Sequence, residues 1–121
     1  MLTTHDNLLA ALPGGAMQEQ FTAILSSPHV RIERIVSTGQ SSPPGFWYDQ
    51  DWDEWVLLIA GSAGLRIEQE GHTRPLRPGD HVTIPAHVRH RIDWTDCTKP
   101  TVWLAVHCLS AATQALACTY R

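Results

Sequence analysis

The sequence predicts an all-β protein, a single antiparallel β-barrel with a short helix before it. From position 29 onward, short β-branched and aromatic runs recur at close intervals, and clusters of Gly, Pro, Ser and Asp separate them. Short strands at this spacing, with turns between them, are typical of a β-sandwich or barrel. The length of 121 residues suits one domain with one core. We therefore expect an N-terminal extension over residues 1–28 and a barrel domain over residues 29–121.

The N-terminal extension contains one predicted helix. Between Ala16 and Ser27, apolar residues recur with a helical period at Met17, Phe21, Ile24 and Leu25. Pro28 ends this segment, because a proline disfavours helical geometry in the residue before it. We expect an amphipathic helix that lies against the outside of the barrel or against a partner subunit.

Seven strands are predicted after this helix. They are His29–Thr38, Glu54–Ala60, Gly64–Glu68, Thr73–Leu76, His81–Ile84, Arg89–Trp94 and Thr101–Leu109. Turn-forming residues separate them, as in Ser42-Pro43-Pro44-Gly45 and Arg77-Pro78-Gly79-Asp80. The tail from Ser110 to Arg121 is compatible with either a short helix or an edge strand.

Composition narrows the partners and the compartment. The formal net charge is -3, which gives no electrostatic reason to expect nucleic acid or an anionic membrane as a partner. The longest apolar run, Trp55–Gly61, is too short to span a bilayer, and the N-terminus lacks a signal-peptide pattern. The cysteines are odd in number and lack CxxC spacing, which favours reduced thiols in the cytoplasm; they are Cys97, Cys108 and Cys118. Small barrels often cover their edge strands by pairing, so we expect a homodimer.

Two stretches carry a motif-like spacing. In the first, six residues separate Glu54 from Gly61, and in the second the spacing joins Gly79, Pro85 and His90. Together they resemble the two signature motifs of the cupin superfamily. The family's first motif has a His-x-His pair, three or four residues, a Glu, then six residues and a Gly. Its second motif runs Gly, five residues, Pro, one residue, Gly, two residues, His, three residues, Asn.

The resemblance covers roughly residues 30–109 and implies a compact cupin barrel of the jelly-roll type. In the second motif, His87 stands in place of the inner Gly and Trp94 in place of the Asn. In the first, the His-x-His pair is absent. Its slots fall on Tyr48 and Gln50 with the shorter spacing, or on Trp47 and Asp49 with the longer, so neither restores an imidazole.

Physical chemistry supports the same residues. Glu54 opens one predicted strand and His90 lies at the start of another, and alternate residues of a barrel strand point inward. A carboxylate and an imidazole from neighbouring strands can then converge on one point, as a divalent metal requires. We predict a metal site formed by Glu54 and His90, with Asp49, Gln50 or Tyr48 adding oxygen, for Zn, Fe, Mn or Ni.

Further candidates for ligand contact lie near the barrel mouth. Trp94 is four residues beyond His90 and is expected to share its face of the strand. Tyr48 is aromatic and falls in a ligand slot of the first motif. His87 and His107 are weaker candidates, for which a surface or hydrogen-bonded role is favoured, because the sequence does not fix the face on which His107 lies.

Two functions of different classes follow. The first is a metal-dependent cupin enzyme acting on a small polar molecule, and the resemblance implies oxygenase, isomerase or lyase chemistry without choosing among them. The second is a non-catalytic ligand-binding or sensory barrel, in which Glu54 and His90 hydrogen-bond a ligand or each other. Both require Glu54 and His90 to meet inside a closed sheet.

Overall fold

The computed structural model describes residues 3–15 and 18–109, and these form eight strands with no helix. The strands are β1 (Gln20–Ser26), β2 (Val30–Ser37), β3 (Trp52–Ala60), β4 (Ala63–Ile67), β5 (Thr73–Leu76), β6 (His81–Ile84), β7 (His90–Thr95) and β8 (Thr101–Leu109). From β2 onward, every strand lies within two residues of its predicted range. The predictions for Ser110 to Arg121 lie outside the described residues.

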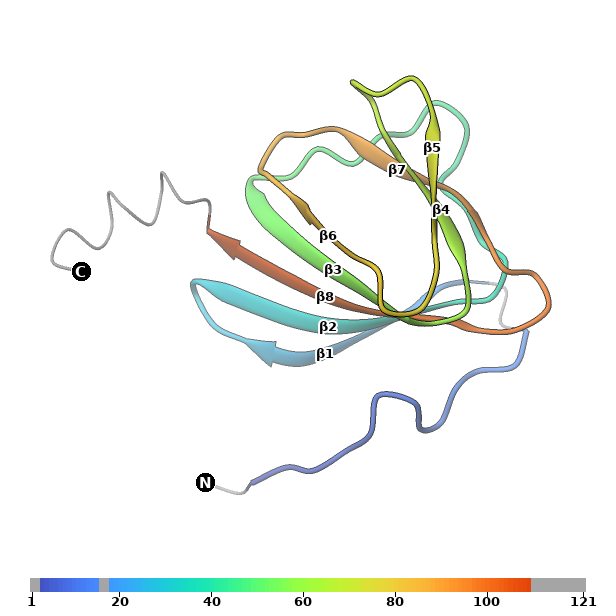
Figure 1. Ribbon diagram of the computed structural model, residues 1–121. Helices are drawn as coiled ribbons and strands as arrows, with labels where there is room; N and C mark the ends of the chain where they lie inside the picture. The colour runs from blue at the N-terminus through green and yellow to red at the C-terminus, as the bar shows by residue number, and fades with distance from the viewer. Residues whose placement is uncertain (1–2, 16–17, 110–121) are drawn as a thin grey trace, which may run out of the picture.

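The strands form two antiparallel sheets that face each other as a jelly roll (Figure 1). The larger sheet has the order β1-β2-β8-β3-β6, and the smaller has the order β5-β4-β7. Each chain crossing from one sheet to the other needs a sharp corner. Gly61 and Gly79 supply two of these corners with φ of 87° and 95°, a backbone conformation that glycine adopts without steric cost.

The hydrophobic core lies between the sheets, where inward-facing residues of both meet. It joins β3, β4 and β8 through fully buried side chains, among them Leu58, Leu65 and Ala105. Trp103 belongs to the same cluster, and its indole Nε1 donates to Ser37 Oγ at 3.2 Å. Four members of this core cluster also line the cavity described below, so the polar site adjoins the core; they are Val56, Leu65, Ile84 and Trp103.

The predicted N-terminal helix is wrong, because residues Gln20–Ser26 form the edge strand β1 and pair with β2. The register shifts between Ala23 and Leu25, which marks a β-bulge at Ile24. A bulge moves the following side chain to the other face of the sheet. Apolar residues at Phe21, Ile24 and Leu25 therefore do not alternate strictly, and their spacing imitates a helical period.

The register of the larger sheet aligns one row of inward-facing residues across four strands. Arg31 of β2 lies opposite His107 of β8, which lies opposite Glu54 of β3, and Glu54 in turn lies opposite Ile84 of β6. Directly opposed residues of antiparallel strands have Cβ atoms about 5 Å apart. The sheet alone thus brings a guanidinium, an imidazole and a carboxylate side by side.

Candidate functional site

A cavity of about 250 Å³ lies between the two sheets. Its apolar wall includes side chains from six strands: Ile35, Val56, Leu65, Ile84, Ile92 and Trp103. Its polar groups come from β2, β3, β7, β8, the loop between β2 and β3, and Glu19 just before β1. This mixture of an apolar wall and a few convergent polar groups is typical of small-molecule sites.

Glu54 is the centre of the polar groups. Its Oε1 lies 3.3 Å from His90 Nε2, and its Oε2 lies 3.3 Å from His107 Nε2. All three side chains are nearly inaccessible, with 11% of the Glu54 side chain and 6% of each histidine side chain exposed. The predicted meeting of Glu54 and His90 inside the barrel is thus what the structure shows, and His107 joins them from β8.

The imidazoles hold Glu54 in its ionised form. Burial on its own raises the pKa of Glu54, but the hydrogen bonds and positive charges of His107 and His90 outweigh burial and lower the pKa to about 2. Burial likewise disfavours the charged form of His90, yet the Glu54 carboxylate and the Val88 carbonyl raise its pKa above the ordinary value. The buried carboxylate is therefore stabilised by neighbours and not by solvent.

The tautomer of His90 follows from its contacts. His90 Nδ1 lies 2.9 Å from Val88 O, and a carbonyl oxygen only accepts, so Nδ1 carries a proton. Nε2 then faces an acceptor-only carboxylate oxygen, and this contact is favourable when Nε2 is protonated too. The geometry therefore agrees with the raised pKa of His90.

The loop between β2 and β3 forms the cavity wall beside His90. Tyr48 N donates to His90 O at 2.7 Å and His90 N donates to Tyr48 O at 3.1 Å, so the loop pairs with the edge of β7. The Tyr48 ring stacks on the His90 ring with centroids 5.4 Å apart. Burial, followed by the charges of nearby carboxylates, raises the pKa of Tyr48, so its phenol stays neutral and can donate a hydrogen bond.

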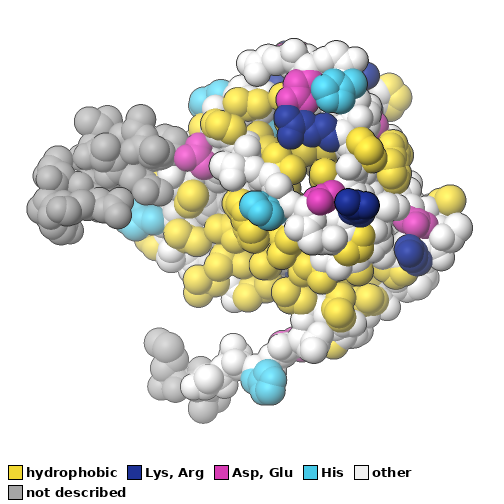
Figure 2. Space-filling view, in the orientation of Figure 1, with side chains coloured by type: hydrophobic (Ala, Val, Ile, Leu, Met, Phe, Trp, Pro, Cys, Tyr) yellow, Lys and Arg dark blue, Asp and Glu magenta, His cyan; other side chains and the backbone are white. Residues whose placement is uncertain are grey.

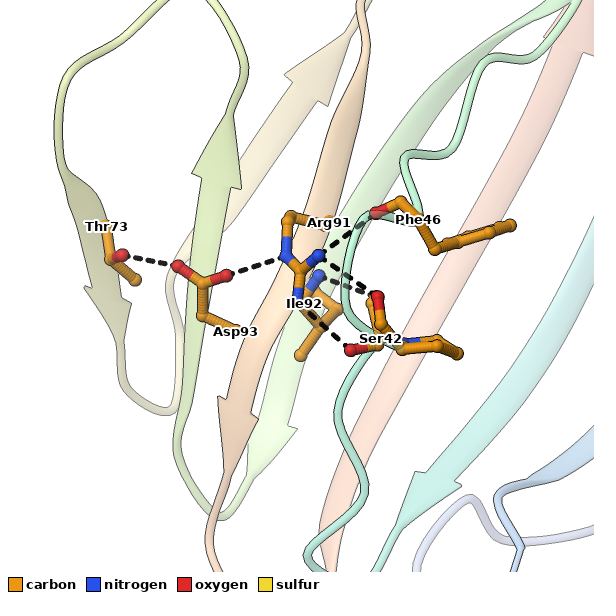
Figure 3. Close-up of polar contacts among 7 residues, drawn as sticks. Ser42, Phe46, Thr73, Arg91, Ile92 and Asp93 are labelled. Atoms are coloured by element: carbon orange, nitrogen blue, oxygen red, sulfur yellow. Dashed lines mark hydrogen bonds and ion pairs between the residues drawn. The ribbon is translucent and has the colours of Figure 1, made fainter.

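Hydrogen bonds from Arg91 hold the same loop against the outside of β7 (Figure 3). Its guanidinium donates to the carbonyl oxygens of Ser42, Pro43 and Phe46 at 3.0, 3.1 and 3.2 Å, and its Nε donates to Asp93 Oδ1 at 2.8 Å. Ser42 Oγ also accepts from the backbone N–H of Ile92 at 3.0 Å. These bonds satisfy backbone carbonyls of an irregular segment and so fix the loop that carries Tyr48 and Gln50.

The structure decides between the two alignments of the first motif. Tyr48 and Gln50 line the cavity, whereas Trp47 and Asp49 do not, so the shorter spacing applies. Gln50 Oε1 is buried and has no hydrogen-bond partner, and the same is true of His107 Nδ1. A buried polar atom without a partner costs free energy, and both atoms are thus available to a ligand or water.

Two predicted site residues lie outside the cavity and contact each other. His87 Nδ1 lies 2.8 Å from Asp49 Oδ1, and His87 Nε2 lies 3.4 Å from Asp51 Oδ1, all on exposed side chains. Neither Asp49 nor His87 faces Glu54. His87 has a φ of 65°, which explains why the cupin motif places a glycine at this position.

Trp94 does not share the face of His90, contrary to the expectation from strand alternation. The pairing of β4 with β7 shifts between Gly64, which lies opposite Trp94, and Leu65, which lies opposite Ile92. This bulge turns Trp94 outward, where 41% of it is exposed and its indole covers the Cα of Gly64. Trp94 is therefore not part of the cavity.

Replacing His87 with glycine tests the surface pair. The hydrogen bond and charge of Asp49 raise the pKa of His87, so the ion pair stabilises the fold below the ordinary pKa and its contribution is lost as pH rises through the raised value. The relief of positive φ in His87→Gly does not depend on pH. We expect the melting temperature of the variant to improve relative to wild type as pH rises from about 6 to about 9. A difference that stays constant across this range in thermal unfolding contradicts the assignment.

The residues do not fit a metal ion as they are arranged. Among residues 3–15 and 18–109, no group of three or more His, Cys, Asp or Glu side chains is placed to hold one. A metal needs its donors about 2 Å from one common point. Here the two imidazoles contact different oxygens of Glu54, and the predicted oxygen donor Asp49 points away.

Sequence reasoning missed three charged residues of the cavity. Glu19 precedes β1, and Arg31 and Glu33 lie on β2; all three line the cavity. Along β2, Arg31, Glu33 and Ile35 occur at every second position, which shows that these three residues share one face. No motif marks them, and only the pairing of β2 with β8 shows that this face is the inner one.

Comparison with known proteins agrees with the fold. The sequence profile of the Cupin domain matches residues 34–107, which is more than half of the chain. The protein therefore belongs to the cupin family, as its two motifs indicated. None of the curated proteins matches its sequence.

Solved structures include a protein from Ralstonia eutropha JMP134, provisionally named a mannose-6-phosphate isomerase. It shares 53% identity with this chain, with 89% of this chain and 100% of that chain covered and a TM-score of 0.88. A cupin superfamily protein from Desulfitobacterium hafniense has 20% identity, coverages of 91% and 95%, and a TM-score of 0.71. An RmlC-like cupin from Methanocaldococcus jannaschii, with a double-stranded β-helix fold, has 18% identity, coverages of 84% and 90%, and a TM-score of 0.64.

The structure also bears on membrane association. No helix among the described residues is long and apolar enough to cross a bilayer.

Proposed function

We propose that this cupin binds a small polar molecule in its barrel cavity, with Glu54, His90 and His107 as the polar anchor. The observation that carries the proposal is a buried, ionised carboxylate held between two imidazoles on the wall of a cavity of about 250 Å³. The neutral phenol of Tyr48 and the unpartnered oxygen of Gln50 lie on the same cavity. These groups supply both donors and acceptors to a hydroxyl-bearing ligand.

The same three side chains are suited to moving a proton. A ligand hydroxyl that enters between Glu54 and His90 can donate to the carboxylate and accept from the protonated imidazole. A ligand in this position separates Glu54 from His90 and removes one of the contacts that lower the pKa of Glu54, which makes the carboxylate a better base for an aldose–ketose isomerisation. The provisional name of the Ralstonia protein supports this chemistry and a sugar-like ligand.

The test is a titration of the protein with D-mannose. Binding is monitored by the NMR signal of the Trp103 indole N–H, which lies on the cavity wall. We expect a specific, saturable shift that weakens at least about tenfold in Glu54→Gln, because a charged hydrogen bond is lost. Glu68→Gln is the matched control, since Glu68 pairs with Arg89 on the surface at 3.0 Å. Equal binding by wild type and Glu54→Gln would contradict the proposal.

A divalent metal in the cavity is the second candidate. Two observations favour it: the Nδ1–H of His90 is held by Val88 O, as in most metal-ligating histidines, and Gln50 Oε1 is buried without a partner. Bound metal would act as a Lewis acid, and His90 and His107 would have to turn toward a common point.

Elemental analysis of protein purified without chelator tests the metal directly. If a metal is resident, we expect near-stoichiometric Zn, Fe, Mn or Ni that is lost in His107→Gln as well as in Glu54→Gln. Protein that is empty and takes up none of the four metals would exclude this candidate. Such a result would leave the small-molecule proposal standing.

We also propose that two copies pair through β1. This strand has a neighbour on one side only, and its large apolar residues are exposed, with 56% of Phe21, 51% of Ile24 and 53% of Leu25 accessible. Figure 2 shows hydrophobic side chains gathered on the face that carries the larger sheet. An uncovered apolar edge favours pairing with another strand. Because Phe21 also lines the cavity, a second copy at β1 would cover one side of it.

Light scattering after gel filtration checks this pairing. Wild type is expected to have the mass of a dimer, and Ile24→Lys to shift toward the monomer because it places a charge in the apolar edge. Leu9→Lys is the control, since Leu9 is exposed to the same degree outside β1. A monomeric wild type would contradict the pairing.

The cytoplasmic location stays a prediction from the cysteine pattern.

A further inference from the structure

The charges on the cavity wall are unequal. The described lining residues include three carboxylates, Glu19, Glu33 and Glu54, and one guanidinium, that of Arg31. Arg31 Nη2 lies 3.7 Å from Glu33 Oε1, so the one guanidinium already has a carboxylate beside it. Glu54 is compensated by its imidazoles. Glu19 accepts a hydrogen bond from Ser37 Oγ at 2.5 Å but has no ion pair among the described residues.

The other nearby guanidinium groups point elsewhere. Arg34, on β2, donates to the backbone carbonyls of Leu8 and Ala10 on the outer face. Arg91 donates to carbonyls of the loop and to Asp93 (Figure 3). Arg89 pairs with Glu68 on the surface. None of these three cations lines the cavity.

A phosphate group needs the opposite arrangement. Proteins bind it with Arg or Lys forks, with helix N-termini or with clusters of free backbone N–H groups. The described residues contain no helix, and the backbone N–H of Ser42 at the cavity wall already donates to Ile92 O at 2.8 Å. A phosphate dianion would therefore meet Glu19 and Glu33, because the imidazoles of His90 and His107 are already paired with Glu54 and the one guanidinium with Glu33.

A small organic cation suits the same wall. Glu19 and Glu33 offer negative charge, and Phe21, Tyr48 and Trp103 offer aromatic rings. A cation is attracted both by carboxylates and by the faces of aromatic rings. We infer that the cavity prefers a ligand bearing an ammonium group and discriminates against a phosphorylated one. This inference rests on the proposed function, because it names the class of ligand for the same cavity.

Three hexoses that differ mainly in charge test the inference: D-mannosamine, D-mannose and D-mannose 6-phosphate. Each hexose is titrated into the full chain at a pH where the amine is protonated. Binding is monitored by the Trp103 indole signal. We expect D-mannosamine to bind at least about tenfold more tightly than D-mannose 6-phosphate, with a difference that shrinks as salt is added.

Charge-neutralising variants identify the residues responsible. The double variant Glu19→Gln/Glu33→Gln keeps the size of both side chains and should remove most of the preference for the amine. Arg31→Gln removes the one guanidinium and should increase that preference. A fold defect would appear as a changed spectrum of unliganded protein, so binding is compared only among variants with the wild-type pattern of core signals.

The outcomes separate this inference from the proposed function. Binding of D-mannose 6-phosphate that equals or exceeds that of D-mannosamine overturns the inference. If that binding is still weakened by Glu54→Gln, the proposed function stands. A preference for the amine that survives in the Glu19→Gln/Glu33→Gln variant also overturns the inference. No response to any of the three hexoses overturns both.

Discussion

The stability advantage of wild type over Glu54→Gln is expected to reach about 3 kcal/mol near pH 5–6 and to vanish as pH falls toward 2. The folded-state pKa of Glu54 is about 2 against an ordinary value of 4.5, so ionised Glu54 stabilises the fold above pH 4.5. This contribution is lost as pH falls through the folded-state value. Glutamine has the size of glutamic acid without its titration, so the difference between the two proteins isolates the carboxylate.

At higher pH, deprotonation of His90 reduces the stability advantage of wild type over Glu54→Gln. Its pKa is raised above 6.5, so its charge stabilises the fold below the ordinary value, and this stabilisation is lost as pH rises through the raised one. Part of the raised pKa comes from Glu54 and disappears with Glu54→Gln. The difference in unfolding free energy is therefore expected to have a maximum between the two transitions.

Urea unfolding of both proteins at a series of pH values measures this difference. Glu68→Gln serves as the control, because it removes a surface carboxylate and is expected to stay within about 0.5 kcal/mol of wild type throughout. A difference between wild type and Glu54→Gln that is the same at pH 3 and pH 6 would mean that Glu54 is not held ionised by its neighbours.

The strands were predictable because their signals are local. Turn residues such as Gly61 and Gly79 mark the corners, and β-branched runs fill the space between them. The inward positions of Glu54 and His90 were predictable for the same reason, since Glu54 precedes the corner at Gly61 and His90 follows the corner at Gly79 at a fixed spacing. The cupin resemblance then placed the two strands in one barrel, which composition alone does not do.

The errors arise where a bulge interrupts the alternation of side chains. Ile24 is the extra residue in β1, and the resulting apolar spacing imitates a helix. A second bulge, between Ile92 and Trp94, turns Trp94 outward although it is four residues beyond His90. Bulges depend on the pairing of two strands, so the sequence of either segment alone does not predict its bulge.

The face of β8 depended on tertiary structure in the same way. His107, Ala105 and Trp103 alternate, but either face of an edge or central strand can carry such a set. Pairing with both β2 and β3 makes β8 a central strand and places His107 opposite Glu54. Long-range pairing likewise brings Glu19 and Glu33 to one wall, which is why the charge of the cavity was not foreseen.

The Gly61→Ala variant is expected to lose about 2–5 kcal/mol of unfolding free energy. Gly61 has a φ of 87°, which costs a residue with a side chain about 1–2 kcal/mol. A Cβ at this position would also collide with Thr101 Oγ1 and lie 2.6 Å from Thr101 Cα and 2.8 Å from Pro100 O. Because two of these three atoms belong to the backbone, a side-chain rotation cannot relieve the clash, and overpacking adds about 1–3 kcal/mol.

Two other glycines separate the causes. Gly79 has a φ of 95° but no atom within 4 Å of an added Cβ, so Gly79→Ala is expected to show only the conformational cost of about 1–2 kcal/mol. Gly71 has neither a positive φ nor a close neighbour, so Gly71→Ala is expected to be within about 0.5 kcal/mol of wild type. Chemical denaturation of the three variants should therefore give the order Gly61→Ala, Gly79→Ala, Gly71→Ala from least to most stable. If Gly61→Ala and Gly79→Ala were equally stable, the close packing of the β3–β4 corner against Thr101 would not be a determinant of stability, and backbone conformation alone would account for both glycines.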